Sequence, residues 1–155
     1  MKILVTGNAG FIGFHTARAL LKRGDEVVGF DNVNTYYEPR LKESRLALLE
    51  HEAHEGQYHF YRANLSDKEA VKRCFNEHQF DRVIHLAAQA GVRHSITHPE
   101  DYVESNLVAF LNVLEACRHH KVAHLTYASS SSVYGANTAM PFSEQHGVNH
   151  PLHMY

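Results

Sequence analysis

Short apolar runs alternate along the chain with longer segments in which apolar residues recur at helical spacing. The runs occupy residues 2–6, 26–30, 58–61, 81–86 and 122–128, and each has the length of a buried strand. The intervening segments carry their apolar residues mainly on one side, as amphipathic helices do. Five strands that alternate with helices in this way predict an α/β fold built from βαβ units around a parallel sheet.

Residues at the ends of the intervening segments mark four helices. We expect helices at residues 11–23, about 36–53, 68–78 and from Pro99 to about residue 119. Gly24 ends the first helix, Asp67 caps the third, and Pro99 lies in the first turn of the fourth. The side chains expected to face the core are Ile12, Ala19, Leu20, Leu41, Leu46, Leu48, Leu49, Val71, Cys74 and Phe75.

The connections between parallel strands decide the topology. Because such connections are almost always right-handed, the doubly wound (Rossmann) arrangement, with helices on both faces of the sheet, is favoured. After Tyr134 the pattern dissolves into Gly, Asn, Pro and His, which predicts a loop. A length of 155 residues suits one domain, which we expect to span residues 1–155.

Composition narrows the class of protein. Lys and Arg total 15 against 17 Asp and Glu, so the formal net charge of −2 gives no electrostatic reason to expect nucleic acid or an anionic membrane as a partner. No apolar run approaches the roughly 18 residues that a membrane-spanning helix needs. The two cysteines, Cys74 and Cys117, lack a CxxC spacing and indicate a reducing compartment, so we expect a cytoplasmic protein.

Fourteen histidines are many for this length, but their spacing does not indicate a metal site. The sequence His-Glu-Ala-His at residues 51–54 is not the HExxH spacing that places two imidazoles on one helical face. We therefore expect no bound metal ion, and we interpret most of these histidines as solvated surface residues.

A glycine-rich turn follows the first predicted strand and opens the first predicted helix. Its glycines, Gly7, Gly10 and Gly13, form a GxxGxxG motif. Gly7 permits the tight turn, Gly10 lets the backbone approach a diphosphate, and Gly13 lets the helix pack closely against the sheet. The helix N-terminus then presents free amides and a partial positive charge to the phosphates.

An acidic residue stands at the end of the second predicted strand. Asp31 comes 18 residues after Gly13, close to the interval expected for a carboxylate that binds the adenosine ribose hydroxyls of a dinucleotide. A carboxylate at this place also repels a 2′-phosphate. The motif and Asp31 together therefore predict NAD as the cofactor in preference to NADP.

These residues and several further stretches resemble the extended short-chain dehydrogenase/reductase superfamily, in particular its NAD-dependent epimerase/dehydratase family and the UDP-glucuronate 4-epimerase branch. The stretches are residues 31–37, 85–93, 105–107, 128–135 and 140–144, and the resemblance covers all 155 residues. It implies an isomerase of carbohydrate metabolism that converts UDP-glucuronate to UDP-galacturonate. In such enzymes NAD removes hydride from C4 of the sugar and returns it to the other face.

The resemblance also implies roles for individual residues. Ser130 and Tyr155 match the catalytic Ser/Thr and the tyrosine of the YxxxK motif, and Arg93, Ser131 and Ser132 would contact the UDP-sugar. Asn64 stands where the family usually has Asp, and its amide oxygen would still accept a bond from the adenine amino group. The residues expected to bind the cofactor are Gly7, Asn8, Gly10, Phe11, Ile12, Gly13, Asp31, Asn32, Asn64, Leu65, Leu86, Ala87, Ala88 and Asn106.

Several alternatives stay open at this point. The chain stops at Tyr155, before the family's lysine, so we expect it to be the amino-terminal portion of an epimerase, without the final strands and the substrate-binding region, and inactive alone. A non-catalytic NAD-binding module and a remnant unable to fold are the alternatives of a different class. Another NAD-dependent UDP-sugar epimerase or dehydratase is a third reading, although Ser131 and Ser132 replace the acid that dehydratases usually carry there. A homodimer is a further expectation.

Overall fold

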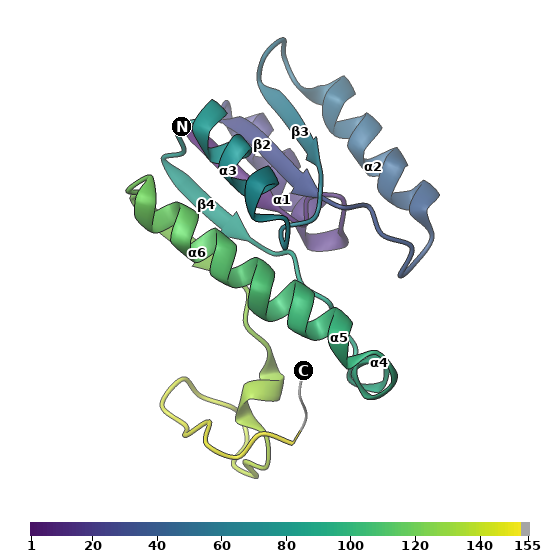
Figure 1. Cartoon of the computed structure of the whole chain (residues 1–155), viewed down its shortest axis with the longest axis vertical. Helices are drawn as coiled ribbons and strands as arrows, with labels where there is room; N and C mark the ends of the chain where they lie inside the picture. The colour runs from purple at the N-terminus through teal and green to yellow at the C-terminus, as the bar shows by residue number, and fades with distance from the viewer. Residues whose placement is uncertain (153–155) are drawn as a thin grey trace.

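The computed structural model describes residues 1–152 and contains a five-stranded parallel sheet with helices on both faces (Figure 1). The strands are β1 (Lys2–Thr6), β2 (Glu26–Asp31), β3 (Tyr58–Arg62), β4 (Arg82–His85) and β5 (His124–Tyr127). Their spatial order is β3-β2-β1-β4-β5, so the chain reverses direction across the sheet after β3. The predicted doubly wound fold is confirmed.

Helical segments within residues 1–152 connect or follow these strands. They are α1 (Phe11–Arg23), α2 (Pro39–Glu52), α3 (Lys68–Glu77), α4 (Val92–Thr97), α5 (Pro99–Tyr102), α6 (Ala109–His119) and a 3₁₀ turn (Ser131–Tyr134). Between α5 and α6 the helix continues through a π-helical stretch, Val103–Val108. The helix predicted from Pro99 to about residue 119 is therefore present, although the sequence pattern did not indicate its π-helical part. No helix among residues 1–152 combines the length and the apolar character that crossing a membrane requires.

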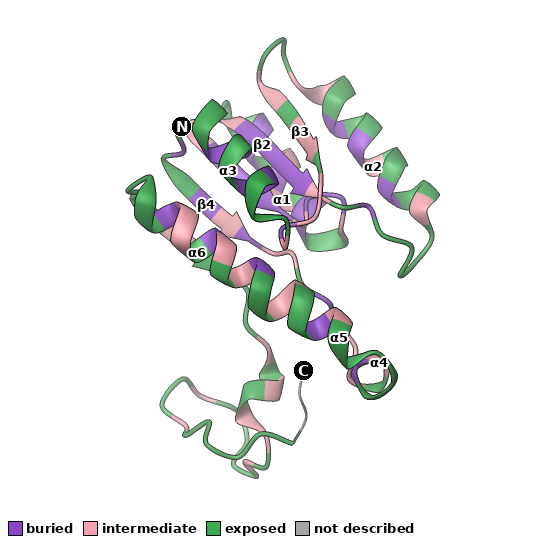
Figure 2. Cartoon of the chain, in the orientation of Figure 1, coloured by how far each residue is buried: buried purple, intermediate pink, exposed green. Residues whose placement is uncertain are grey.

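Alternate residues of the strands face two separate cores, as the pleat of a sheet requires. Ile3 and Val5 on β1 pack with the buried faces of α1 and α2, whereas Leu4 packs with residues of α3 and α6. The central strands are therefore buried on both sides (Figure 2). This burial explains why the strands appear in the sequence as continuous apolar runs and not as an alternating pattern.

The buried faces of the helices differ in part from the predicted ones. In α1 the inward residues include Gly13 and Ala17, whereas Ile12 is 64% exposed and Ala19 is also exposed. The small side chains bring the helix axis close to the sheet, so the face carrying Gly13 must turn inward. In α2 the predicted Leu46 and Leu49 are buried but Leu41 and Leu48 are not, and in α3 the predicted Val71, Cys74 and Phe75 are all buried.

The segment after β5 confirms the predicted loop. Residues 135–152 contain no helix or strand, and they extend away from the sheet (Figures 1 and 2). Most of these residues are exposed. The loop therefore adds nothing to either core.

A buried polar contact joins the carboxyl ends of β1 and β4. The hydroxyl oxygen of Thr6 accepts hydrogen bonds from the amides of Leu86 and Ala87, each at 3.1 Å, and lies 2.8 Å from Nδ1 of His85. With both of its lone pairs used, the hydroxyl must donate its proton to Nδ1. The His85 imidazole is therefore neutral, with its own proton on Nε2.

The pKa of His85 makes folding stability depend on pH. Burial lowers this pKa to about 4, compared with about 6.5 in the unfolded chain. Between these values the unfolded state binds a proton that the folded state does not. The contribution of His85 to stability is therefore complete above pH 6.5 and is lost as the pH falls to about 4.

We expect the free energy of unfolding to decrease as the pH is lowered from 6.5 to 4, with His85 contributing a slope of up to about 1.4 kcal/mol per pH unit. Urea titrations at several pH values would measure it. His85→Asn should flatten the slope, whereas His51→Gln, at an exposed position of α2, should leave it unchanged. An undiminished slope in the His85 variant would show that the buried imidazole does not cause the effect.

Candidate functional site

The three glycines of the GxxGxxG motif lie at the junction of β1 and α1, where the carboxyl ends of the strands meet. Gly7 has a φ of +69°, and a Cβ at this position would lie 2.8 Å from the amide nitrogen of Ala87 on the neighbouring strand connection. A Cβ on Gly13 would lie 2.1 Å from the carbonyl oxygen of Gly7. The turn and the helix approach each other so closely that only glycine fits at both positions.

The first turn of α1 faces this junction without a side-chain cap. Gly10 is the N-cap residue, no side chain accepts a bond from the first turn, and the turn contains no acidic residue. The first intrahelical bond runs from the amide of Phe14 to the carbonyl of Gly10, 3.0 Å away. The earlier amides are thus left to an external acceptor, which suits an anion at the positive end of the helix dipole.

Asp31 at the end of β2 is held beside the glycine-rich turn. One carboxylate oxygen accepts a hydrogen bond from the amide of Ala9 at 3.1 Å, and the other accepts from the amide of Val33 at 2.8 Å. Both bonds orient the carboxylate without neutralising its charge. Each oxygen has a further lone pair for a ligand hydroxyl.

A cleft opens at the carboxyl ends of β1, β2 and β4. It brings together most of the residues expected to bind a cofactor, namely Gly7, Gly10, Asp31, Asn32, Asn64, Leu65, Leu86, Ala87 and Ala88. Five other expected residues do not line it: Asn8, Phe11, Ile12, Gly13 and Asn106. Phe11 and Ile12 lie in the exposed first turn of α1, so their amides and not their side chains are placed to bind an anion.

Two of the expected cofactor residues use their side chains inside the protein. Asn8 is fully buried, and its amide group donates to the hydroxyl of Tyr58 at 2.6 Å. Asn106, in the π-helical stretch, accepts a bond from the amide of Gln89 at 2.8 Å and donates to the Gln89 carbonyl at 2.9 Å. Asn106 therefore shapes the cleft by holding the backbone of Gln89, which itself lines it.

Asn64 lines the cleft and bonds to residues beside it. Its side-chain oxygen accepts from the amide of Ser66 at 3.2 Å, and its amide group donates to the Glu104 carboxylate at 2.8 Å. The oxygen has one lone pair left, so it could still accept a bond from an amino group.

The structure adds cleft residues that sequence reasoning missed, including Asn34, Tyr36, Tyr37, Lys42, Gln89 and Ser105. Lys42 is the most unusual, because it is only 4% exposed. Its ammonium group donates to the backbone and side-chain oxygens of Asn34 at 2.8 and 2.6 Å. Burial lowers the pKa of Lys42, and the nearby negative charge of Asp31 opposes that effect. The only indication in the sequence was that Lys42 lies in the predicted helix that follows residues 31–37, one of the stretches that resemble the family.

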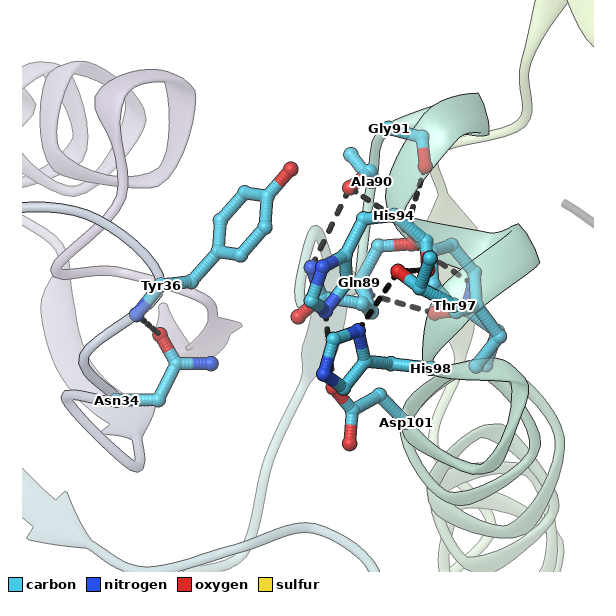
Figure 3. A network of polar contacts seen from close by, with 11 residues as sticks. Asn34, Tyr36, Gln89, Ala90, Gly91, His94, Thr97, His98 and Asp101 are labelled. Carbon is cyan, nitrogen blue, oxygen red and sulfur yellow. Dashed lines mark hydrogen bonds and ion pairs between the residues drawn. The ribbon is translucent and has the colours of Figure 1, made fainter.

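A polar network lies next to the cleft and shares Asn34, Tyr36 and Gln89 with its lining (Figure 3). Tyr36, from the segment after β2, points toward His94 of α4, and the two rings meet edge-on with centroids 5.2 Å apart. His94 stacks on His98 and lies 3.0 Å from the carboxylate of Asp101. Segments about sixty residues apart in sequence thus meet at this edge. Residues 1–152 contain no group of three or more His, Cys, Asp or Glu side chains placed to share a metal ion.

The residues expected to act on the substrate lie away from the described cleft. Ser130 accepts a hydrogen bond from the amide of Ser132 at 3.1 Å and so caps the 3₁₀ turn that begins at Ser131. None of these three serines lines the cleft, and Arg93 is an exposed residue of α4. Tyr155 lies outside the described residues. The serines follow β5 and therefore lie beyond the carboxyl end of that strand, the end of the parallel sheet at which the cleft also opens.

Comparison with known proteins places this geometry in context. Residues 4–155 match the family model described as GDP-mannose 4,6 dehydratase. Protein CapI of Staphylococcus aureus is 48% identical over 155 residues, which cover 100% of this chain and 45% of CapI. UDP-glucuronate 4-epimerase 6 of Arabidopsis thaliana is 44% identical over 156 residues, covering 100% of this chain and 33% of the plant protein.

A solved structure of UDP-glucuronic acid 4-epimerase from Bacillus cereus, in complex with NAD and UDP-4-deoxy-4-fluoro-glucuronic acid, has a similar fold. Its TM-score is 0.86 at 36% sequence identity, and the match covers 99% of this chain and 47% of that protein. The chain thus spans less than half the length of these relatives.

Proposed function

The chain belongs to the NAD-dependent epimerase/dehydratase family, and from this premise we propose that it is the NAD-binding part of a UDP-sugar 4-epimerase that converts UDP-glucuronate to UDP-galacturonate. The observation that carries the proposal is the junction of β1 and α1 with Asp31 beside it. The junction suits a dinucleotide for three reasons. The turn has no room for a Cβ at Gly7 or Gly13, the N-terminus of α1 is uncapped, and hydrogen bonds fix the carboxylate of Asp31.

The proposed cofactor contacts follow from these groups. The amides at the start of α1 would bind the diphosphate, and Asp31 would accept from the ribose hydroxyls of the adenosine half. Asn64 would accept from the adenine amino group. The same carboxylate would repel a 2′-phosphate, so we propose NAD and not NADP.

The proposed chemistry is a temporary oxidation at C4 of the sugar. Bound NAD would supply the hydride acceptor, and the same hydride would return to the opposite face. Ser130 and Tyr155 would hold and move the proton of the 4-hydroxyl, and Arg93, Ser131 and Ser132 would contact the UDP-sugar. The choice of UDP-glucuronate is supported by the names of the plant and Bacillus cereus relatives.

The location and assembly of the protein are also proposals. Cys74 and Cys117 are buried free thiols, which favours a reducing, cytoplasmic environment. Leu107, Leu111 and Leu114 are exposed along the α6 region and would be available to a second copy in a homodimer. The charge of −2 offers no attraction to nucleic acid or to an anionic membrane.

The activity can be measured on a protein that begins with residues 1–155 and has the full length of the relatives. We expect it to interconvert UDP-glucuronate and UDP-galacturonate without added NAD, as followed by chromatography of the UDP-sugars. Ser130→Ala should lower kcat by about 100-fold or more if the hydroxyl takes part in proton transfer, whereas Ser44→Ala on α2 should have no effect. A protein that binds NAD but leaves every UDP-uronate unchanged would refute the proposed substrate.

A further inference from the structure

Arg45, on the second turn of α2, contacts the glycine-rich turn from outside the cofactor cleft. Its Nη1 atom donates to the carbonyl oxygen of Ala9 at 3.1 Å and lies 2.9 Å from the hydroxyl oxygen of Tyr37, to which it also donates. Sequence reasoning assigned this residue no role, and it is not among the residues lining the cleft. Yet Ala9 lies between the glycines that the cofactor must approach.

The Ala9 residue is held from two sides. Its amide donates to the carboxylate of Asp31 at 3.1 Å, and its carbonyl accepts from Arg45. Ala9 itself is fully buried against Val33 and Leu46. An acid on β2 and a base on α2 thus fix one peptide segment in the middle of the turn.

Fixing this carbonyl orients the groups that follow it. The Ala9 carbonyl belongs to the same peptide plane as the Gly10 amide, which donates to the carbonyl of Gly7 at 3.0 Å. The next amides, those of Phe11 and Ile12, are the uncapped ones at the start of α1. Because glycine has a wide choice of backbone angles, Gly10 needs such external anchoring if those amides are to keep one direction.

The charge of Arg45 also lies close to the start of α1. Its guanidinium carbon is 6.0 Å from the ring centroid of Phe11 and 5.9 Å from that of Tyr37. These contacts hold the side chain above the turn, and the positive charge adds to that of the helix N-terminus. Lys42, one helical turn earlier, lies 4.4 Å from the centre of the Tyr37 ring, so Tyr37 is held by two cations.

We propose that Arg45 is a positioning residue for the dinucleotide diphosphate: by holding the Ala9 carbonyl it directs the amides at the start of α1 toward the phosphates. The proposal rests on the proposed binding of NAD. It makes no claim that Arg45 touches the cofactor. Its effect must therefore depend on the diphosphate and not on the adenosine part of the ligand.

The test compares ligands with and without a diphosphate. Calorimetry or protein NMR would measure the binding of NAD, ADP and adenosine to the chain and to its Arg45→Met variant. We expect the variant to bind NAD and ADP about tenfold more weakly, since a hydrogen bond from a charged group is lost, and to bind adenosine as before. Arg45→Lys should recover part of the affinity, because it keeps the charge but not the fork of donors.

Arg118→Met is the matched control. It causes the same change in net charge, but Arg118 lies on α6 and pairs with Glu115 on the surface. It should bind all three ligands like the wild type. If Arg45→Met weakens the binding of NAD, ADP and adenosine equally, the role of Arg45 is only structural and the proposal is wrong. The proposal is also wrong if the variant binds all three ligands as tightly as the wild type.

Hydrogen exchange on the ligand-free chain separates this proposal from the proposed function. The amides of Ala9 and Gly10, which donate to Asp31 and to the carbonyl of Gly7, should exchange faster in Arg45→Met than in the wild type or in Arg118→Met. If the wild type binds no NAD, the cofactor assignment fails, while the exchange rates still decide whether Arg45 fixes the turn. Unchanged exchange of these amides would overturn the positioning role.

Discussion

Gly13→Ala should destabilise the chain by about 3 kcal/mol or more, the largest effect that we expect of any conservative substitution. The added Cβ would lie 2.1 Å from the carbonyl oxygen of Gly7, 2.7 Å from its carbonyl carbon and 2.8 Å from the Cα of Asn8. All three atoms belong to the backbone, so no side chain can rotate away. Either α1 must move off the sheet or the glycine-rich turn must open.

The sign of this effect is the informative part. Alanine in place of glycine within a helix ordinarily stabilises a protein by up to about 1 kcal/mol. Urea unfolding monitored by circular dichroism would give the free energy of unfolding, and calorimetry would show whether NAD binding is lost as well. Gly147→Ala, where the nearest atom to the added Cβ is 3.8 Å away, should change stability by less than about 0.5 kcal/mol. A Gly13 variant as stable as the wild type would contradict the close approach of helix and turn.

Asp31→Asn should lower the affinity for NAD by about 100-fold. The carboxylate is the acceptor proposed for the two ribose hydroxyls, and charge-assisted hydrogen bonds are about twice as strong as neutral ones. Asparagine keeps the size of the side chain but loses the charge and one of its two acceptor oxygens. The bonds that now hold the carboxylate to the amides of Ala9 and Val33 would also be weakened.

Titration calorimetry with NAD and NADP would measure the change for both cofactors. Because the negative charge is what repels a 2′-phosphate, the preference for NAD over NADP should shrink in Asp31→Asn. Glu55→Gln, with the same change in charge at an exposed position after α2, should leave both affinities unaltered. An Asp31 variant that keeps full affinity and full preference for NAD would refute the role of the carboxylate.

Sequence and structure agree best where a single segment dictates its own conformation. The apolar runs became β1 to β5, although β4 and β5 are one or two residues shorter at each end than predicted. The register between them aligns Arg82–His85 with His124–Tyr127, and the amide of the next residue, Ala128, still donates to the carbonyl of His85 at 3.1 Å. Asp67 caps α3 through the amides of Glu69 and Ala70, as the sequence indicated.

Agreement is weaker where the direction of a side chain matters. Helical spacing predicted that Ile12, Ala19 and Leu20 share the inward side of α1, but only Leu20 is buried. The side that faces the sheet depends on Gly13, whose missing side chain lets the helix approach. Asn8 and Asn106 were assigned to the cofactor from their place in motifs. Their side chains instead bond to Tyr58 and Gln89, because a motif does not fix where a side chain points.

The sequence by itself determined the doubly wound fold, the glycine-rich turn and the acid at the end of β2. These features depend on strand and helix periodicity and on backbone angles, which neighbouring residues control. Only the tertiary structure decided that Lys42 and Arg45 reach the segments that surround the cleft. Arg45 and Ala9 are 36 residues apart, and their contact exists because α2 packs beside the turn. Such a contact depends on how two separately formed elements are placed, which no local pattern encodes.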